Sequence, residues 1–252
     1  SGLDEFVQVF QILEERKVRG SRFNAPTLAI QNRLLFRSTT ELAGRTVEAE
    51  VWSLSPSDTS VLRANEAFSA LLHAEGERPK RIASVAPNHA SVVLVVEVGD
   101  HKVLLGADLE RTRDPGTGWT AIVEDSTTRS STVDVFKVPH HGGESANEPR
   151  VWSELLSPDP WALLSPFCRG NTLLPTSDDV VRIRSLTSRA YITAPPVQRR
   201  YRFKRIVHES LRDATRSIRN VHSGWGHVRL RRSITAKSTP WEVELFGDAC
   251  IL

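Results

Sequence analysis

Two adjacent histidines, His140 and His141, follow a short apolar run and precede two glycines in the stretch DVFKVPHHGG. Two other polar groups stand at the ends of apolar runs: Asn88 and His89 precede SVVLVVEV, and Asp108 follows KVLLGA. Imidazole nitrogens and carboxylates at strand ends are common ligands of hydrolytic metal sites. If these strands share a sheet and end on the same side, the groups meet and form a candidate metal site.

Each of these residues also has an ordinary explanation when it is taken alone. A lone histidine such as His89 or His101 is more often a surface or core residue than a ligand. Asp108 fits a turn, and the glycines after His141 fit a loop. The ordered combination of Asn-x-x-Ser, Gly-x-Asp and His-His-Gly favours the site.

The elements that must position these residues are apolar strands interleaved with helices. Strands over 91–98 and 102–108 are joined by Gly99-Asp100, which is a strong hairpin signal. Residues 132–139 form another buried strand, which ends beside the histidines. Further strands are expected over 27–36, 46–55, 161–165 and 190–193, and helices over 3–18, 56–74, 151–157 and 177–188, the last with Ser177 as its N-cap. This order predicts an α/β layered fold.

The C-terminal part of the chain is strongly basic. From Arg199 to Arg232 eleven Arg or Lys residues face two Asp or Glu residues, although the whole chain carries a net charge of only +3. Residues 202–219 read as an amphipathic basic helix, and the segments around 226–232 and 241–247 as a hairpin. The residues expected to bind nucleic-acid phosphates are Arg199, Arg200, Arg202, Lys204 and Arg205. A solvated helix face is the alternative.

Composition narrows the class of protein. The chain has 252 residues, two cysteines and no methionine. No run of about 18 apolar residues is present, so no membrane span or membrane partner is expected. The few cysteines suit a reducing, cytoplasmic setting.

Three motifs together resemble the metallo-β-lactamase fold: NHASVVL (88–94), LLGAD (104–108) and KVPHHGG (137–143). They resemble most closely the subgroup containing the hydrolase domain of the bacterial competence DNA-uptake channel protein. The resemblance runs from residue 1 to about 194. It implies an αββα sandwich that is incomplete at its N-terminus, with 1–195 as the C-terminal part of the domain. Residues 196–252 would be a basic helix and hairpin packed on the same domain.

The resemblance also implies roles for individual residues. Asp108 would bridge two divalent ions, Zn or Mn, held about 3.5–4 Å apart. His140 would be a ligand, and His141 a ligand or a contact to the oxygen of the scissile group. Asn88 would orient substrate. Ser91 and Ser165 would support the ligands through hydrogen bonds. The implied reaction is attack of a metal-activated water on a phosphodiester, with nucleic acid as substrate; lactone, thioester and phosphocholine-ester hydrolysis remain open.

The sequence departs from this family in three places. The signature His-x-His-x-Asp-His is absent, Leu174 stands where relatives often have histidine, and Gly143 where serine is usual. The chain is expected to begin just after that signature and to be inactive alone. An N-terminal fragment or partner chain would supply the motif and cover an exposed apolar seam. The alternative is a metal-free relative that serves as a nucleic-acid or protein binding module.

Overall fold

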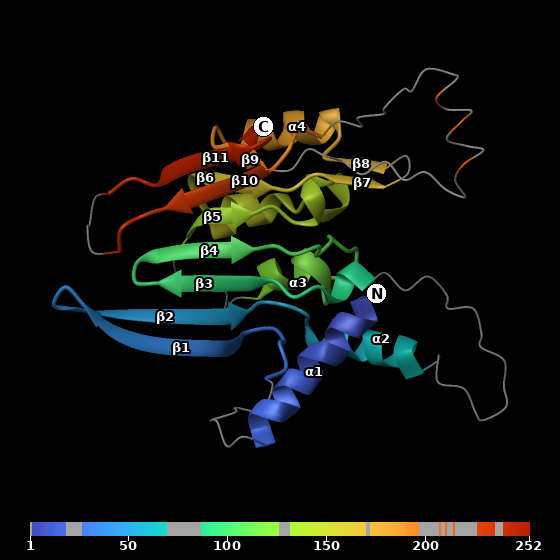
Figure 1. Cartoon of the computed structure of the whole chain (residues 1–252), viewed down its shortest axis with the longest axis vertical. Helices are drawn as coiled ribbons and strands as arrows, with labels where there is room; N and C mark the ends of the chain where they lie inside the picture. The colour runs from blue at the N-terminus through green and yellow to red at the C-terminus, as the bar shows by residue number, and fades with distance from the viewer. Residues whose placement is uncertain are drawn as a thin grey trace.

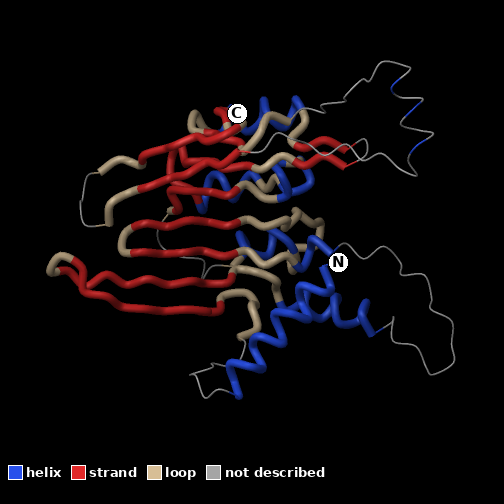
Figure 2. Tube along the Cα trace, viewed as in Figure 1, coloured by secondary structure: helices blue, strands red, loops and turns tan. Residues whose placement is uncertain are grey.

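The computed structural model describes residues 2–18, 27–69, 87–125, 132–169, 172–196, 226–234 and 239–252, with the isolated positions 207, 210 and 214. The described part consists of helices, one large mixed sheet and two small two-stranded sheets (Figures 1 and 2). The α/β class predicted from the sequence is confirmed. The predicted basic helix over 202–219 lies outside the described residues apart from those isolated positions.

The main sheet has eight strands, and its two halves run differently. In spatial order the strands are β1 (Arg33–Leu42), β2 (Arg45–Ser53), β3 (Leu94–Val98), β4 (His101–Leu105), β5 (Val133–Lys137), β6 (Leu156–Leu164), β9 (Ala190–Ile192) and β12 (Cys250–Ile251). Neighbours from β1 to β4 are antiparallel, and those from β4 through β5 and β6 to β9 are parallel. The C-terminal β12 pairs antiparallel with β9, so the tail of the chain completes the edge of the sheet.

In the part of the chain that the structure describes, four helices with defined bounds and several short helical turns precede or connect the strands. The helices are α1 (Gly2–Val18), α2 (Asp58–Ser69), α3 (Gly118–Glu124) and α4 (Ser177–Leu186). The short turns are η1 (Pro87–Ala90), η2 (His140–Gly142), η3 (Glu144–Ala146) and η4 (Val151–Leu155). Two small two-stranded sheets pair β7 (Phe167–Arg169) with β8 (Thr172–Leu174), and β10 (Gly226–Arg231) with β11 (Glu242–Gly247).

One face of the sheet is sealed by α3, α4 and η4. Register places Val95, Leu104, Phe136 and Ala162 in one row on this face, and all four are buried. Trp119 of α3 meets the Phe136 ring edge-on at a centroid distance of 6.1 Å, and Trp152 of η4 meets it at 5.3 Å. These contacts form the main hydrophobic core.

The opposite face is also apolar but less covered. Its central row consists of Val51, Val96, Val103, Val135 and Trp161, of which only Val135 is buried. The β10–β11 hairpin is drawn in front of this face in Figure 1, and the edge contact of Trp241 with His101 at 5.8 Å agrees with that placement. Strands with apolar side chains on both faces are typical of a sheet that is covered on both sides.

Several predicted elements need correction. The predicted strand over 27–36 begins only at Arg33, because residues 31–32 form a turn. The predicted strand over 161–165 begins earlier, at Leu156, directly after η4. The N-cap of α4 is Thr176 and not Ser177: the Thr176 hydroxyl accepts from the Asp179 backbone N–H and Asp179 returns the bond, which makes a capping box. Helix α3 and the short strands β7, β8 and β12 were not predicted.

Within the part of the chain described, no helix is both long and apolar enough to cross a membrane.

Candidate active site at the ends of three parallel strands

The predicted site residues lie beyond the carboxyl ends of neighbouring parallel strands. Asp108 follows β4, His140 and His141 follow β5, and Ser165 follows β6. Ligands of open α/β sheets bind in this position, outside the carboxyl ends of the strands. The sheet changes from antiparallel to parallel at β4, so the site also lies at a change in topology.

Backbone hydrogen bonds hold the loops after β4 and β5 together. The Gly106 N–H donates to Lys137 O at 3.0 Å, and the His140 N–H donates to Ala107 O at 3.0 Å. Further along, the Arg111 N–H donates to Ser145 O at 2.8 Å. A Cβ on Gly106 would lie 2.8 Å from Lys137 O, so this close approach needs glycine. The two loops therefore form one unit.

Three residues without a glycine's freedom adopt left-handed backbone conformations in this unit. Ala107 has φ 47°, His140 has φ 45° and His141 has φ 56°. Such conformations cost on the order of 1–3 kcal/mol each and persist where the surrounding structure enforces them, most often at functional sites. Their concentration at two adjacent strand ends supports a functional reading of this place.

His140 is embedded in a polar network. Its Nδ1 lies 3.1 Å from Glu110 Oε1 and 3.0 Å from Ser145 Oγ. The Ser145 hydroxyl donates to the same Glu110 oxygen at 2.7 Å. The other oxygen of Glu110 lies 3.8 Å from His89 Nε2, which brings η1 to the site. Glu110 thus links three segments that are far apart in the sequence.

His141 is held by different partners. Its Nδ1 lies 3.0 Å from Ser165 O and 3.4 Å from Ser165 Oγ, and its ring lies 5.1 Å from the Phe167 ring. Because a carbonyl only accepts, the His141 Nδ1–H is the donor and Nε2 is left for another partner. The predicted supporting residue Ser165 is therefore in contact with His141.

Asp108 is exposed at the end of β4. Lys137 supplies the neighbouring positive charge: burial lowers the pKa of its ammonium group, and the charge of Asp108 opposes that shift. The Lys137 ammonium also donates to Val138 O at 3.1 Å. Asp108 therefore faces solvent beside a cation.

The other predicted residues differ in their placement. Asn88 lies in η1, and Ser91 follows it with its N–H donating to Asn88 O at 3.1 Å. The Ser91 carbonyl accepts from Ser55 Oγ at 2.6 Å, which ties this segment to the loop after β2. His101 lies at the opposite end of β4 against Trp241, away from the site.

Gly143 and Leu174, two positions at which the sequence departs from the family it resembles, are neighbours. A Cβ on Gly143 would lie 3.3 Å from Leu174 Cδ1 and 3.4 Å from His140 O. The apolar Leu174 side chain therefore lies beside the histidine turn.

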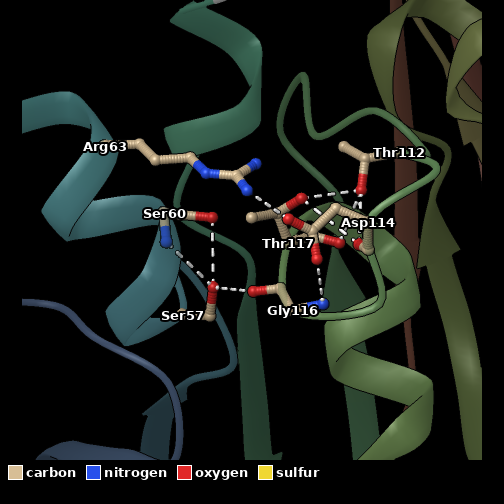
Figure 3. Close-up of polar contacts among 7 residues, drawn as sticks. All are labelled: Ser57, Ser60, Arg63, Thr112, Asp114, Gly116 and Thr117. Carbon is tan, nitrogen blue, oxygen red and sulfur yellow. Dashed lines mark hydrogen bonds and ion pairs between the residues drawn. The ribbon is translucent and has the colours of Figure 1, made fainter. Parts of the chain in front are cut away.

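The loop that carries Glu110 is tied to helix α2 by the polar cluster in Figure 3. The Ser57 hydroxyl donates to Gly116 O at 2.6 Å, and Arg63 forms an ion pair with Asp114. The pKa of Asp114 is lowered by the Gly116 N–H, which donates to its carboxylate, and by the Arg63 charge. Trp119 adds a backbone bond from its N–H to Glu110 O at 3.2 Å. The cluster therefore has a structural explanation, which is to fix residues 110–119.

The carboxylate and imidazole donors at the site are of the types that bind a divalent metal, but the described residues provide too few of them for a complete ligand set. An imidazole whose second nitrogen is held by a carboxylate, as in His140 with Glu110, is the usual arrangement around metal-ligating histidines. Asp108 offers a carboxylate on the adjacent strand end. Among the described residues, however, no group of three or more His, Cys, Asp or Glu side chains is arranged to hold a metal ion.

Glu110 and Ser145 were missed in the sequence. Glu110 follows Asp108 by two residues, but residues 107 and 108 form a turn, so no strand alternation in the sequence marks Glu110. Ser145 reaches Glu110 only through the fold. The predicted nucleic-acid contacts Arg199, Arg200, Arg202, Lys204 and Arg205 lie outside the described residues.

No protein-family model, no curated protein and no solved structure matches the chain. The functional assignment therefore depends on the site itself and on the three motifs.

Proposed function

We propose that this chain carries part of the catalytic site of a metallo-β-lactamase-type hydrolase, with Asp108 and His140 as metal ligands. The observation that carries the proposal is that these two donors follow adjacent parallel strands. In addition, Nδ1 of His140 lies 3.1 Å from Glu110 Oε1. That engagement leaves Nε2 of His140 for a metal. Carboxylate and imidazole together suit Zn or Mn.

The reaction we propose is phosphodiester hydrolysis in DNA or another nucleic acid. Two bound divalent ions would supply an activated water near neutral pH and neutralise charge on the phosphoryl oxygens. His141, fixed by Ser165, can donate from Nε2 to a substrate oxygen when its ring is protonated. Asn88 in η1 is proposed to orient the substrate with its amide.

The metal proposal needs donors beyond those described, so we infer a second polypeptide segment. An N-terminal portion or a partner chain with His-x-His-x-Asp-His would supply them, and this chain alone would be inactive. Two features support a missing covering layer. Val7, Val9, Phe10 and Ile12 of α1 are exposed, and the second face of the main sheet is only half-buried. An αββα sandwich would place a second sheet over that face.

Nucleic acid is the favoured substrate because of the charge of the C-terminal part. Eleven basic residues against two acidic ones provide the sequence-independent attraction that phosphate backbones require. Part of this charge is already compensated in the described hairpin, where Arg229 pairs with Glu244 at 2.7 Å. The phosphate contacts are therefore proposed for residues 199–205.

The test combines mass and metal analysis on the same purified sample. Intact mass under denaturing conditions identifies any co-purifying polypeptide, and the metal content is measured for the wild type, Asp108→Ala and His140→Ala. We expect about two metals per complex, lost in both variants and retained in the control His101→Ala. Retention of metal in both site variants would contradict the assigned ligands. DNA cleavage is then assayed with the complete complex.

A metal-free binding module is the second candidate, because the described residues include no group of three metal donors and Leu174 packs beside the histidine turn. In that case the sample would be a single 28.1 kDa species without metal. It would bind nucleic acid with an affinity that falls steeply as the salt concentration rises.

A further inference from the structure

We propose that Glu110 is a positioning residue for His140, which it holds in the tautomer that carries the proton on Nδ1. Ser145 is the third member of this network. The inference rests on the proposed function in treating His140 as a working side chain of the site. In this proposal, Glu110 determines which ring nitrogen of His140 is free to bind a ligand.

The hydrogen-bond chemistry leaves one assignment for the neutral ring. An ionised carboxylate has no proton to donate, so the 3.1 Å distance between Glu110 Oε1 and His140 Nδ1 favours a proton on Nδ1. The Ser145 hydroxyl uses its own proton toward Glu110 at 2.7 Å, and its oxygen can accept only from the same Nδ1–H. Both contacts favour Nδ1–H and leave the lone pair on Nε2.

Contacts within the protein hold the network in place. The side chains of Glu110 and His140 are 19% and 23% exposed, so solvent competes weakly with their contact. The backbone bonds His140 N–Ala107 O and Arg111 N–Ser145 O clamp the two loops on either side of the pair. The Trp119 N–H holds the carbonyl of Glu110 itself. The other carboxylate oxygen, Oε2, lies on the side of His89, 3.8 Å from its Nε2, and Oε1 lies on the side of His140.

The test reads the tautomer directly, with long-range ¹H–¹⁵N correlation spectra of the imidazoles in the full 252-residue chain. His140 is assigned from the signal lost in His140→Gln. In the wild type, with the ring neutral, we expect Nδ1–H to exceed Nε2–H by about tenfold or more, the factor for one hydrogen bond to a charged group. A dominant Nε2–H form in the wild type would overturn the proposal without any variant.

Variants separate positioning from general loss of structure. Glu110→Ala should lower the Nδ1–H to Nε2–H ratio about tenfold, and Ser145→Ala should lower it less, because the direct contact with Glu110 remains. Glu110→Gln should restore much of the ratio, since its amide oxygen still accepts. Glu144→Ala, which removes the same charge from the exposed residue next to Ser145 in η3, is the control and should leave His140 unchanged. An unchanged ratio in Glu110→Ala would also overturn the proposal.

The outcome is independent of metal content and of activity. A complex of the chain with the second polypeptide that holds no metal but shows Nδ1–H at His140 would sink the proposed function and keep the positioning role. If metal binds through His140 but Glu110→Ala does not change the ratio of the two tautomers, the proposed function stands and the positioning role of Glu110 is wrong.

Discussion

The Arg182 guanidinium on α4 donates a 2.6 Å hydrogen bond from Nη2 to the carbonyl oxygen of Gly142, the residue directly after the two histidines. Asp179, one turn earlier on the helix, holds the same guanidinium through Nη1 at 2.7 Å. The histidine turn is therefore tied to α4 as well as to the loop after β4. This contact extends the site across three elements.

Replacing Arg182 with lysine should destabilise the protein. The single ammonium group cannot reproduce the two-armed contact with Asp179 and Gly142. We expect the free energy of unfolding to fall by about 1–3 kcal/mol, measured by denaturant unfolding. Arg184→Lys on the exposed side of the same helix is the control and should stay within about 0.5 kcal/mol of the wild type. Equal costs at the two positions would contradict the tie between α4 and the turn.

Gly142→Ala should be costly for two reasons. Its φ of 82° disfavours any side chain, and an added Cβ would lie 2.7 Å from Leu164 Cδ2 and 2.9 Å from Ile183 Cδ1. Gly44 has a similar φ of 73° with nothing within 4 Å of its Cβ position, so Gly44→Ala isolates the backbone term. Thermal or denaturant unfolding should show about 1 kcal/mol for Gly44 and at least about 1–3 kcal/mol more for Gly142. A cost at Gly142 no larger than at Gly44 would show that the turn has room to relax.

The capping box of α4 makes a paired prediction. Thr176→Ala removes the side chain that accepts from the Asp179 N–H at 3.2 Å and should cost about 1 kcal/mol. Ser177→Ala, one residue later and exposed, should change the unfolding free energy by less than about 0.5 kcal/mol. The reverse order would restore Ser177 as the cap.

Asp159 should contribute a pH-dependent term. Its pKa is lowered, first by the Ser188 N–H and then by the hydroxyls of Ser188 and Thr187 and the charge of Arg189. A carboxyl with a lowered folded pKa stabilises the fold above its ordinary value of 3.8, and that contribution is lost as the pH falls through the folded value.

The comparison for this prediction is wild type against Asp159→Asn. Asparagine tolerates the φ of 53° at this position, so backbone strain should not contribute to the difference in stability between the two proteins. The wild type should be more stable by less than about 1 kcal/mol near neutral pH, because the side chain is 39% exposed. The difference should shrink as unfolding is measured at pH values below about 4. A constant difference across the series would mean that ionisation of Asp159 is not its source.

Local signals in the sequence predicted much of the fold. The β3–β4 hairpin follows from Gly99-Asp100 between two β-branched runs, and Val98 pairs with His101 as that turn requires. Helix α3 was missed because it is short and its start lies in a Gly-rich loop; what stabilises it is the burial of Trp119, which no local pattern reveals. Thr176 was missed although the spacing to Asp179 carried the capping-box signal.

The sequence predicted the donor residues of the site better than the hydrogen-bond network around His140. His140 and Asp108 stand at the ends of apolar runs that the sequence shows directly. The Ser145 contact to Glu110 joins residues that only the clamp between two loops brings together.

The change of direction at β4 has a consequence for the order in which the protein folds. Strands β1 to β4 are antiparallel neighbours, although a segment containing α2 and η1 separates β2 from β3, and the hairpins β1–β2 and β3–β4 close over short loops. The parallel half, from β4 to β9, needs crossover connections, and the antiparallel edge strand β12 comes from the C-terminal part of the chain. Such long-range pairings form slowly. Because Asp108 follows β4 and His140 follows β5, the two donors come together only when the parallel β4–β5 pair has formed, and not in the β3–β4 hairpin alone. The His140–Glu110 contact should therefore appear late in refolding, with the native core.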